Sequence, residues 1–463
     1  MDMHKLTSEN RNSILGISFD GLATSGIVNE LLNVAAVLRQ DIDRVLVDLG
    51  RDIAMSRTMD FDNAYIPAWV EIVSCLEPCP KGYTPDLVQE VRTHVVSGIS
   101  VAEAKVYDSL CLEMGVLLIK TFRRNHVRIL IVENGTLPDN PVFTEALYLA
   151  IAAYGAQKKL GKYVLWRDHD LMWSTEPHLF GSYPYPGVRK PFANPHIHYA
   201  VLTEWMRQKM QTWAPNVTYH VMPNRFFSAE LQCTDGSLRS AYGISKEDYL
   251  VSRCTRVVPQ KSIERDLRLL DLLQRKLRAS GNHRRIFLFI TGPINEDPAE
   301  FRRLRDLAKA LSVEKQIIWA NGLLPFSPLI NNPRKPSNHF SIRDLLAEAD
   351  LNSFLTTYDY EGFGNPPAEA MAMNVPFIST TYELYHEVYG SKGVIAPLLM
   401  IDHVTTPDAS IPDSFISETL QILTDDTYRQ AVIGHNKEVC HRFFSLESLK
   451  WQLHELFPEV LKF

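Results

Sequence analysis

The sequence predicts an α/β protein made of two doubly wound, Rossmann-like domains. Short apolar strands alternate with helical patterns in both halves of the chain, which is typical of parallel sheets covered by helices. Each half also contains a strand, a glycine-bearing turn and a helix in succession, at residues 14–38 and 351–373. The length of 463 residues can hold two domains of ordinary size.

Composition excludes several classes of protein. Hydrophobic content of 45% and charged content of 22% describe a globular chain and exclude a disordered one. A net charge of −6 argues against nucleic-acid binding. We expect no signal peptide, no membrane-spanning segment and a cytoplasmic location, because the start is polar and apolar runs are short. The six cysteines are expected to be reduced thiols, and no metal site is expected.

The first half reads as one Rossmann-like unit. Its opening strand runs into a glycine turn ending at Gly26, and that turn is expected either to lie against a ligand or only to reverse the chain. The region 55–80 is expected to be irregular, a loop with short strands as the alternative. The sequence predicts strands at 14–20, 43–49, 128–134, 162–170 and 198–203, and helical stretches at 84–118 and 143–155.

Polar side chains follow two of these strands. Glu133 and Asn134 end one strand, and His169 and Asp170 follow the next. Carboxyl ends of parallel strands open on the crevice where ligands bind, so we interpret these residues as site candidates, with capping or turn roles as the alternative. The aromatic segment 171–198 is expected to be a long loop that either recognises an acceptor or only packs.

The second half repeats the pattern after a polar, turn-rich linker at 228–245. We expect domains at 1–235 and 246–444, followed by a closing helix at 445–463. A 16-residue insertion, 325–340, interrupts one connection. Strands are predicted at 248–256, 286–292, 316–322, 351–357 and 376–381, and helices at 263–277 and 341–349, the latter capped by Ser341.

The most informative stretch is residues 361–372, EGFGNPPAEAMA. Glycines in the turn free the backbone for positive φ or for close approach of a ligand. Prolines suit the first turn of the helix that follows, and the positive N-terminus of that helix favours an anion or a polyol. Two carboxylates, Glu361 and Glu369, flank the turn.

Two cations precede this stretch in the chain. Arg256 and Lys261, in RVVPQK, lie five residues apart at a strand end and a helix start, a spacing that suits a pyrophosphate. Solvated surface cations are the alternative. Basic runs at 274–285 and 302–309 are expected to be solvated helix faces, with peripheral membrane contact as the alternative.

These motifs resemble those of a known family. EGFGNPPAEAMA is similar to the E-x7-E signature of retaining glycosyltransferases of the GT-B fold, family 4 in particular. RVVPQK resembles the R-x4-K element that binds the donor diphosphate, and His169-Asp170 resembles the HD element whose His contacts the transferred sugar. The resemblance implies two Rossmann-like domains facing across a cleft, with the C-terminal helix crossing back to the first.

The resemblance also implies roles for individual residues. Glu369 would hold the ribose, and Glu361 with the amides of the turn would hold the sugar hydroxyls. Tyr358-Asp-Tyr360 replaces the small residues usual before this motif and is expected to reshape the pocket. The implied catalytic residues are His169, Arg256, Lys261 and Glu361. The implied donor-binding residues are Gly26, Asn321, Gly322, Gly362, Phe363, Gly364, Asn365, Pro366 and Glu369. The acceptor candidates are Glu133, Asn134 and Asp170.

The implied function is transfer of a hexose, with retention, from a UDP-, GDP- or ADP-sugar to a small polar acceptor. That acceptor would be a sugar, sugar acid or polyol, with or without a phosphate, and no metal or other cofactor would be required. The alternatives are a lipid-linked or cell-envelope glycan acceptor, a catalytically silent nucleotide-sugar-binding protein, and a phosphorylase. The base, the sugar, the linkage and the oligomeric state stay open.

Overall fold

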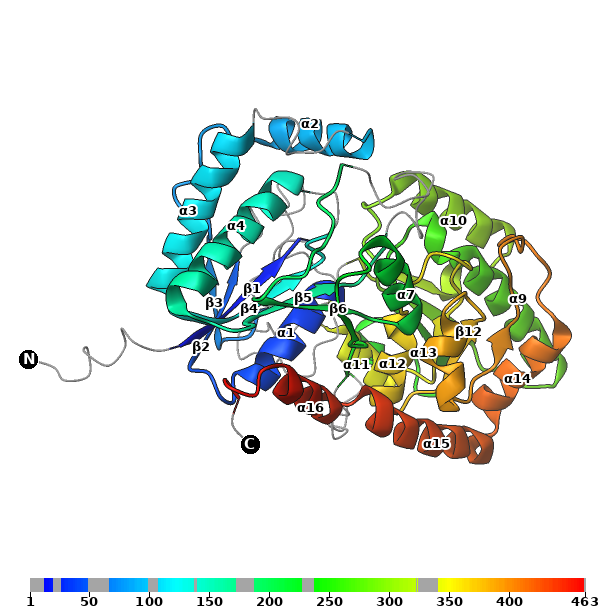
Figure 1. Cartoon of the computed structure of the whole chain (residues 1–463). Coiled ribbons are helices and arrows are strands. Elements are labelled where there is room, and N and C mark those ends of the chain that lie inside the picture. The colour runs from blue at the N-terminus through cyan, green and yellow to red at the C-terminus, as the bar shows by residue number, and fades with distance from the viewer. Residues whose placement is uncertain are drawn as a thin grey trace, which may run out of the picture. The chain divides into compact units, whose positions relative to one another are not determined.

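The computed structural model describes residues 12–19, 26–48, 66–98, 107–136, 140–171, 187–226, 237–321, 323 and 340–461. The described chain forms two compact units. The first comprises the residues up to Arg225 together with those from Leu446 onward, and the second runs from Phe226 to Ser445. Each unit is built on one parallel sheet with helices packed against it (Figure 1).

The sheet of the first unit has the order β3-β2-β1-β4-β5-β6-β7. Every neighbouring pair is parallel. The chain order reverses between β1 and β4, which is the switch point where doubly wound sheets bind ligands. The strands are β1 (Ser13–Ser18), β2 (Arg44–Asp48), β3 (Val70–Val73), β4 (Val127–Glu133), β5 (Val164–Asp168), β6 (Ile197–Val201) and β7 (Tyr219–Val221).

The helices of the first unit bury apolar stripes against this sheet. Leu31 and Leu32 of the first helix are almost fully buried, and Leu449 and Leu453 of the last helix join the same core. The prediction that the C-terminal helix returns to the first domain is therefore confirmed. The helices are α1 (Gly26–Leu38), α2 (Pro85–Val96), α3 (Asp108–Arg124), α4 (Pro141–Lys158), α7 (Glu204–Trp213) and α16 (Leu446–Leu456).

The sheet of the second unit has the order β10-β9-β8-β11-β12-β13, again with all pairs parallel. The switch point here lies between β8 and β11. The strands are β8 (Tyr249–Arg253), β9 (Ile286–Ile290), β10 (Ile317–Trp319), β11 (Leu351–Phe354), β12 (Phe377–Thr380) and β13 (Leu398–Leu399). The helices are α8 (Ser237–Ala241), α9 (Ile263–Ala279), α10 (Pro298–Ala310), α11 (Ile342–Glu348), α12 (Asn365–Ala372), α13 (Tyr385–Val388), α14 (Asp413–Thr424) and α15 (Asp426–Phe444).

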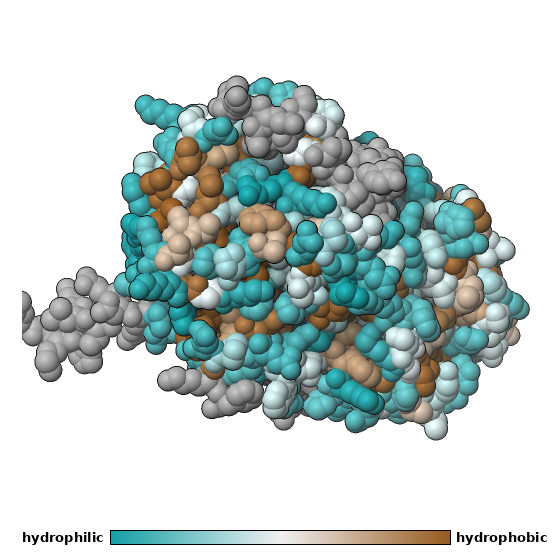
Figure 2. All heavy atoms as spheres, viewed as in Figure 1, coloured by the Kyte–Doolittle hydropathy of each residue, from teal (hydrophilic) through white to brown (hydrophobic). Residues whose placement is uncertain are grey.

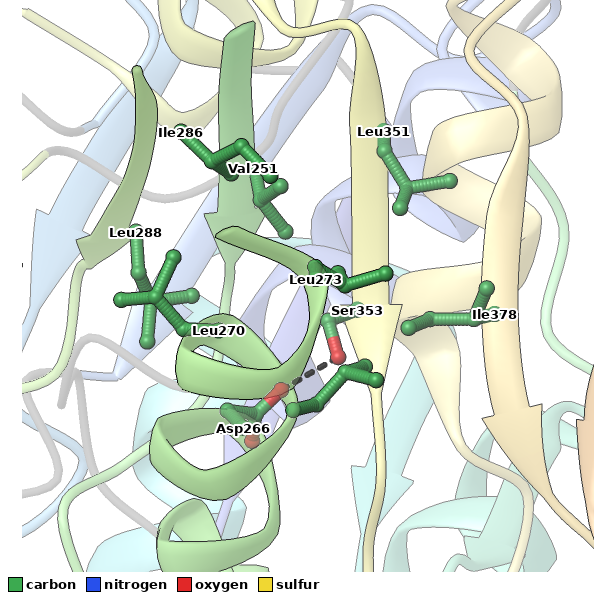
Figure 3. Close-up of a pocket in the computed structure, with 10 residues that line it drawn as sticks. Val251, Asp266, Leu270, Leu273, Ile286, Leu288, Leu351, Ser353 and Ile378 are labelled. Carbon is green, nitrogen blue, oxygen red and sulfur yellow. Dashed lines mark hydrogen bonds between the residues drawn. The ribbon is translucent and has the colours of Figure 1, made fainter. Parts of the chain in front are cut away.

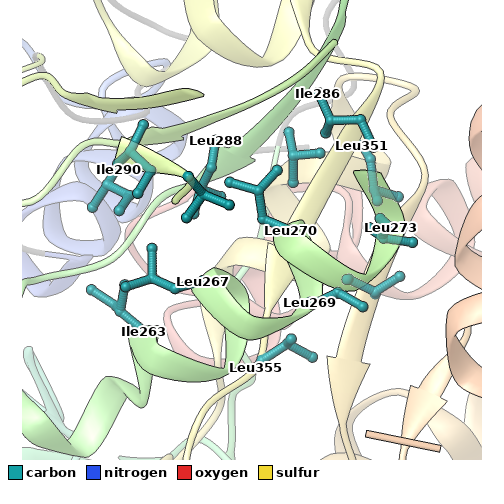
Figure 4. Packing of buried hydrophobic residues seen from close by; sticks show 14 of the residues in the cluster. Ile263, Leu267, Leu269, Leu270, Leu273, Ile286, Leu288, Ile290, Leu351 and Leu355 are labelled. Atoms are coloured by element: carbon teal, nitrogen blue, oxygen red, sulfur yellow. The ribbon is translucent and has the colours of Figure 1, made fainter. Parts of the chain in front are cut away.

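Helix α9 provides much of the second core. Its leucines at positions 267, 270 and 273 pack on the apolar side chains of β8, β9 and β11 (Figure 4). A small cavity remains between α9 and the sheet, where Ser353 donates a hydrogen bond to Asp266 (Figure 3). The remaining residues that line this cavity are aliphatic, so it belongs to the core.

Two local expectations need correction. The stretch 84–118 is not one helical run, because α2 ends at Val96 and α3 begins at Asp108. The segment 228–245 is not simply a linker, because α8 lies in it. Arg239 of α8 donates hydrogen bonds to the Asp350 carboxylate at 2.8 Å and to the Glu348 carbonyl at 2.9 Å, which ties this helix to the second unit. The segments 172–186 and 324–339 lie outside the described residues.

The surface is mainly hydrophilic on the face in Figure 2, with apolar side chains gathered over α3 and α4. Leu112 and Val116 of α3 are 59% and 49% exposed, and Leu149 of α4 is 40% exposed. Within the described ranges, no helix combines the length and apolar character needed to cross a bilayer.

Candidate active site

The glycine turn after β11 requires glycine at one position. Gly364 caps α12 with φ of 80°, a left-handed conformation that side chains disfavour. A Cβ there would lie 2.7 Å from Tyr382 Oη and 2.8 Å from Phe354 Cε1. Pro366 and Pro367 occupy the first turn of the helix, as the sequence predicts. The helix N-terminus is therefore held at a fixed place beside the switch point.

Two buried tyrosines, which the sequence did not single out, hold this turn. Tyr382 Oη donates to the Phe363 carbonyl, and Tyr389 Oη donates to the Gly364 carbonyl, each at 2.5 Å. The Phe363 side chain is 4% exposed and packs edge-on against Tyr389 and Phe444. Phe363 was expected to contact the donor, but the structure gives its ring a place in the packing that anchors the turn.

Lys261 and Glu361 meet beside the turn. Lys261 Nζ lies 2.5 Å from Glu361 Oε1, and Thr356 Oγ1 donates to the same oxygen at 2.9 Å. Their side chains are 12% and 9% exposed, so the pair is partly shielded but still accessible. The ring of Tyr360 lies 4.6 Å from the ammonium group, within cation–π range.

A buried arginine, Arg253, fixes the backbone at Lys261. Lys261 ends the short 3-10 helix Pro259–Lys261, and its carbonyl accepts a hydrogen bond from the buried guanidinium of Arg253. Arg253 also donates to the Ser353 carbonyl of β11 at 3.2 Å. Arg253 of β8 therefore links the backbone of Lys261 to β11.

Arg256 has a different environment from Lys261. It forms an ion pair with Glu296, and its side chain is 55% exposed. Its loop is pressed against Gly292, where a Cβ would lie 2.4 Å from the Thr255 carbonyl oxygen. The structure therefore brings Lys261 to Glu361 and directs Arg256 to Glu296.

The other donor candidates differ in how deeply they are buried. Glu369 is 7% exposed on α12, and burial together with its charge raises the pKa of the neighbouring thiol of Cys254. Asn365 begins α12, and the Pro366 carbonyl accepts a hydrogen bond from Asn352 at 3.2 Å. Gly362 lies in the turn, half-buried.

The base-side candidates are less well supported. Asn321 has φ of 41° and its side-chain oxygen accepts from the Ile294 amide at 3.1 Å, so it stabilises a turn. Gly322 lies outside the described residues. Gly26 in the first unit is the exposed first residue of α1, and residues 20–25 before it lie outside the described ranges as well.

A buried charged cluster forms the second candidate region, at the carboxyl ends of β4 and β5. Both carboxylate oxygens of Glu133 accept hydrogen bonds from the guanidinium of Arg167, at 2.7 to 3.2 Å. Oε2 also lies 2.7 Å from His169 Nε2. Glu133 and Arg167 are fully buried and His169 is 4% exposed. Glu133, expected to contact an acceptor, is thus already engaged by two side chains.

The neighbours of His169 fix its backbone as well. Asn134 adopts φ of 59°, and its side-chain oxygen accepts from the His169 amide at 2.7 Å. The Asn134 amide group donates to Asp170 Oδ2 at 3.3 Å. Asp168 accepts hydrogen bonds from the backbone and hydroxyl of Thr136 at 3.2 and 2.6 Å.

Glu30 of α1 completes the cluster, and the sequence did not reveal it. Its Oε2 lies 3.9 Å from Arg167 Nη1 and accepts from the Arg225 amide at 3.3 Å. Burial raises the pKa of Glu30 to about 7, although Arg167 opposes the rise. Burial also pushes the pKa of Glu133 upward, but Arg167 and His169 outweigh it, so that pKa is lowered. The pKa values of two buried glutamates beside one arginine are therefore shifted in opposite directions.

Asp168, at the end of β5, also has a shifted pKa. Burial raises the pKa of Asp168 to about 6, against the two bonds from Thr136. Among the residues that the structure describes, no group of three or more His, Cys, Asp or Glu side chains is placed to hold a metal ion.

Cys75, Cys79, Cys111, Cys254 and Cys440 are free thiols, as expected.

Comparison with known proteins identifies the fold. No protein-family model matches the chain, and no curated protein matches its sequence. Among solved structures, sucrose-phosphate synthase from Thermosynechococcus elongatus superposes with a TM-score of 0.60 at 13% identity, covering 97% of this chain and 99% of that one. A glycosyltransferase from Rickettsia africae gives 0.57 at 13% identity, covering 98% and 99%. Anabaena HepE in complex with UDP-glucose gives 0.56 at 13% identity, covering 96% and 99%. The chain therefore shares the GT-B fold with these proteins, and the predicted fold class is confirmed.

Proposed function

We propose that this chain is a retaining glycosyltransferase that moves a hexose from a nucleotide-diphosphate sugar to a hydroxyl group of a small polar acceptor. The observation that carries the proposal is the pair of Lys261 and Glu361 beside the glycine-capped N-terminus of α12. Lys261, Glu361 and the N-terminus of α12 follow β8 and β11, the two strands at the switch point of the second sheet. Related folds include one solved with UDP-glucose bound.

The donor diphosphate is the natural ligand of the cationic groups. The Lys261 ammonium and the positive N-terminal end of the α12 dipole would stabilise the negative charge that develops on the departing diphosphate. Arg256 would contribute after leaving Glu296, from a more exposed position. Because Lys261 is paired with Glu361, donor binding would exchange one anion for another at the ammonium group.

The carboxylates then bind hydroxyl groups. Glu361, released from Lys261, would accept hydrogen bonds from the sugar hydroxyls, and the turn amides at 362–365 would donate to them. Glu369 would hold the ribose. Charge-assisted bonds of this kind are about twice as strong as neutral ones. The pair is not assigned as the acid and nucleophile of a hydrolase. In the front-face reaction of retaining enzymes the departing phosphate takes the acceptor proton, so the step requires neither a protein base nor a metal.

The first unit would supply the acceptor side. Asn134 and Asp170 are the proposed acceptor contacts, and His169 contacts the transferred sugar. A small polar acceptor in the cytoplasm fits these polar groups best. The same reaction on a lipid-linked or cell-envelope glycan, and a silent nucleotide-sugar-binding protein, are outcomes that the following experiment separates.

The test is a transfer assay on the purified full chain. UDP-, GDP- and ADP-glucose would each be combined with a panel of sugars, sugar acids and phosphorylated polyols, and with a short-chain lipid-linked acceptor. Release of nucleoside diphosphate and the product spectrum by NMR are recorded. We expect turnover with one donor and a polar acceptor, and a product with the anomeric configuration of the donor.

Other results would change the assignment. Turnover only with the lipid-linked acceptor moves the acceptor class to membrane glycans. Donor binding by calorimetry without turnover on any acceptor supports the silent binding protein. Binding of none of the three donors contradicts the proposal as a whole.

A further inference from the structure

The ring of His169 is held by a chain of buried charges that the proposed reaction does not use. Arg167 donates to both oxygens of Glu133, and Glu133 lies 2.7 Å from His169 Nε2. Arg167 and Glu133 are fully buried. A buried ion pair is weak support for stability, because well-packed apolar residues of similar size often do as well. The arrangement therefore calls for a role other than stability.

The charges decide which nitrogen of the ring carries hydrogen. With two bonds from Arg167, Glu133 is held as a carboxylate, and a carboxylate only accepts hydrogen bonds. The hydrogen in the contact must therefore belong to His169 Nε2. The hydrogen bond made by one ring nitrogen fixes the state of the other, so a neutral ring has a bare Nδ1.

The second nitrogen is left available. His169 hydrogen-bonds to the described residues through its backbone amide and Nε2, while Nδ1 has no partner among them. Bonds at the backbone and at Nε2 restrict rotation of the ring. The His169 side chain keeps a 4% exposed fraction at the carboxyl end of β5, the edge where doubly wound sheets bind ligands.

We infer that Glu133 is a positioning residue for His169, fixing Nε2–H inward and presenting Nδ1 as the acceptor for a ligand hydroxyl group. The inference rests on the proposed glycosyl transfer, because it takes the hydroxyl to be one of the transferred sugar or the acceptor. Arg167 acts through Glu133, and Glu30 lies on the far side of Arg167 at 3.9 Å. This reassigns Glu133 from acceptor contact to support of His169.

The first test reads the ring directly in the unmodified protein. The full chain is labelled with 15N-histidine, and the signals of His169 are identified by their loss in His169→Gln. We expect a protonated Nε2 and an unprotonated Nδ1, and a shift of the Nδ1 signal when the active donor from the UDP-, GDP- and ADP-glucose panel is added. A hydrogen on Nδ1 with a bare Nε2 would overturn the inference, as would an Nδ1 signal unchanged by saturating donor and acceptor.

The second test uses kinetics. Glu133→Gln removes the charge but keeps an acceptor, and misplacement of a contacting group by a small distance can cost about 100-fold in rate. We expect kcat to fall by about 10- to 100-fold with a donor KM changed less than about threefold. Glu71→Gln is the matched control, since it removes a glutamate charge from an exposed ion pair with Arg44 and should leave kcat unchanged.

The outcomes keep the two proposals apart. A folded Glu133→Gln protein with wild-type kcat contradicts the positioning role and leaves glycosyl transfer intact. If no donor supports turnover in the wild-type chain, the proposed function fails. The NMR measurement does not depend on folding of the Glu133 variant, so the pairing of Glu133 with His169 is tested in either case.

Discussion

The two candidate regions differ in how their charges are compensated. Around His169, the carboxylate of Glu133 and the guanidinium of Arg167 are fully buried and form an ion pair. Around the glycine turn, Lys261 and Glu361 are 12% and 9% exposed and form one direct ion pair. The first cluster pairs its main charges inside the protein, whereas the second holds charges whose partners can be exchanged.

This difference indicates that the buried cluster supports other residues, whereas the Lys261–Glu361 pair binds a ligand. Breaking a fully buried pair leaves an uncompensated charge and costs about 3–5 kcal/mol of stability. Breaking a partly exposed pair costs far less, and a diphosphate can replace the carboxylate at the ammonium group. Substitutions of Lys261 and Glu361 should therefore change ligand binding more than folding, and those in the buried cluster should change folding stability as well as turnover.

The largest effect is expected for Lys261→Met. The change removes the charge opposite the departing diphosphate, and loss of one such electrostatic contact lowers the rate by about 100- to 1,000-fold. Steady-state kinetics with the active donor measures it, and the melting temperature should change by only a few degrees. Lys276→Met is the control, because Lys276 pairs with Asp413 at the surface. Equal kcat/KM in the Lys261 variant and the control would show that Lys261 does not contact the departing diphosphate.

A smaller effect is expected for Glu369→Gln. Hydrogen bonds to charged groups contribute about 1.5–3 kcal/mol, so the donor KM should rise by roughly 10- to 100-fold while kcat changes little. Asp426→Asn is the control, since Asp426 is an exposed carboxylate in an ion pair with Arg429. A Glu369→Gln enzyme with unchanged donor KM would show that Glu369 does not hold the ribose.

Stability should depend on pH through Glu30. Burial raises its pKa from 4.5 to about 7, so between these values the folded chain keeps a proton that the unfolded chain has released. The free energy of unfolding therefore falls as pH rises through this window. Glu30→Gln removes the proton exchange, and its stability relative to the wild type should rise by about 2–3 kcal/mol between pH 5 and pH 8.

Urea unfolding at several pH values measures this change. Glu438→Gln, which alters an exposed glutamate, should reproduce the wild-type pH dependence. A Glu30→Gln protein whose stability relative to the wild type is the same at pH 5 and pH 8 would contradict a proton-binding Glu30.

The smallest effect is expected for Arg256→Ala. Its side chain is 55% exposed and pairs with Glu296, and exposed charges contribute less than about 1 kcal/mol in most cases. We expect kcat/KM to fall less than about fivefold, which steady-state kinetics in parallel with Lys261→Met would show. A loss as large as that of Lys261→Met would mean that Arg256 turns fully toward the diphosphate when the donor binds.

The comparison also shows what the sequence could and could not predict. Features set by neighbours in the chain were predicted, such as the glycine turn and prolines that begin α12 and the capping of α11 by Ser341. Apolar patterns likewise predicted most strands and the helical structure of α16, whereas its return to the first unit was implied by the resemblance. These signals are local, and propensity and capping express them within a few residues.

Side-chain partners distant in the chain were not predictable. Glu133 meets Arg167 only because β4 and β5 pair in register, and Glu30 contacts Arg225 across 195 positions. Phe363 points into the packing because Tyr389 and Phe444 surround it, and nothing in EGFG indicates that direction. Arg256 pairs with Glu296, forty residues on. Such choices depend on tertiary packing, which a motif does not encode.

The most direct test of the central claim is calorimetric titration of the full chain with nucleotide sugars. The account predicts one binding site for one of UDP-, GDP- or ADP-glucose, with affinity reduced at least about tenfold in Lys261→Met and unchanged in Lys276→Met. Equal affinity in wild type and Lys261→Met, or binding of none of the three donors, would contradict the claim that this turn and its lysine form a nucleotide-sugar site.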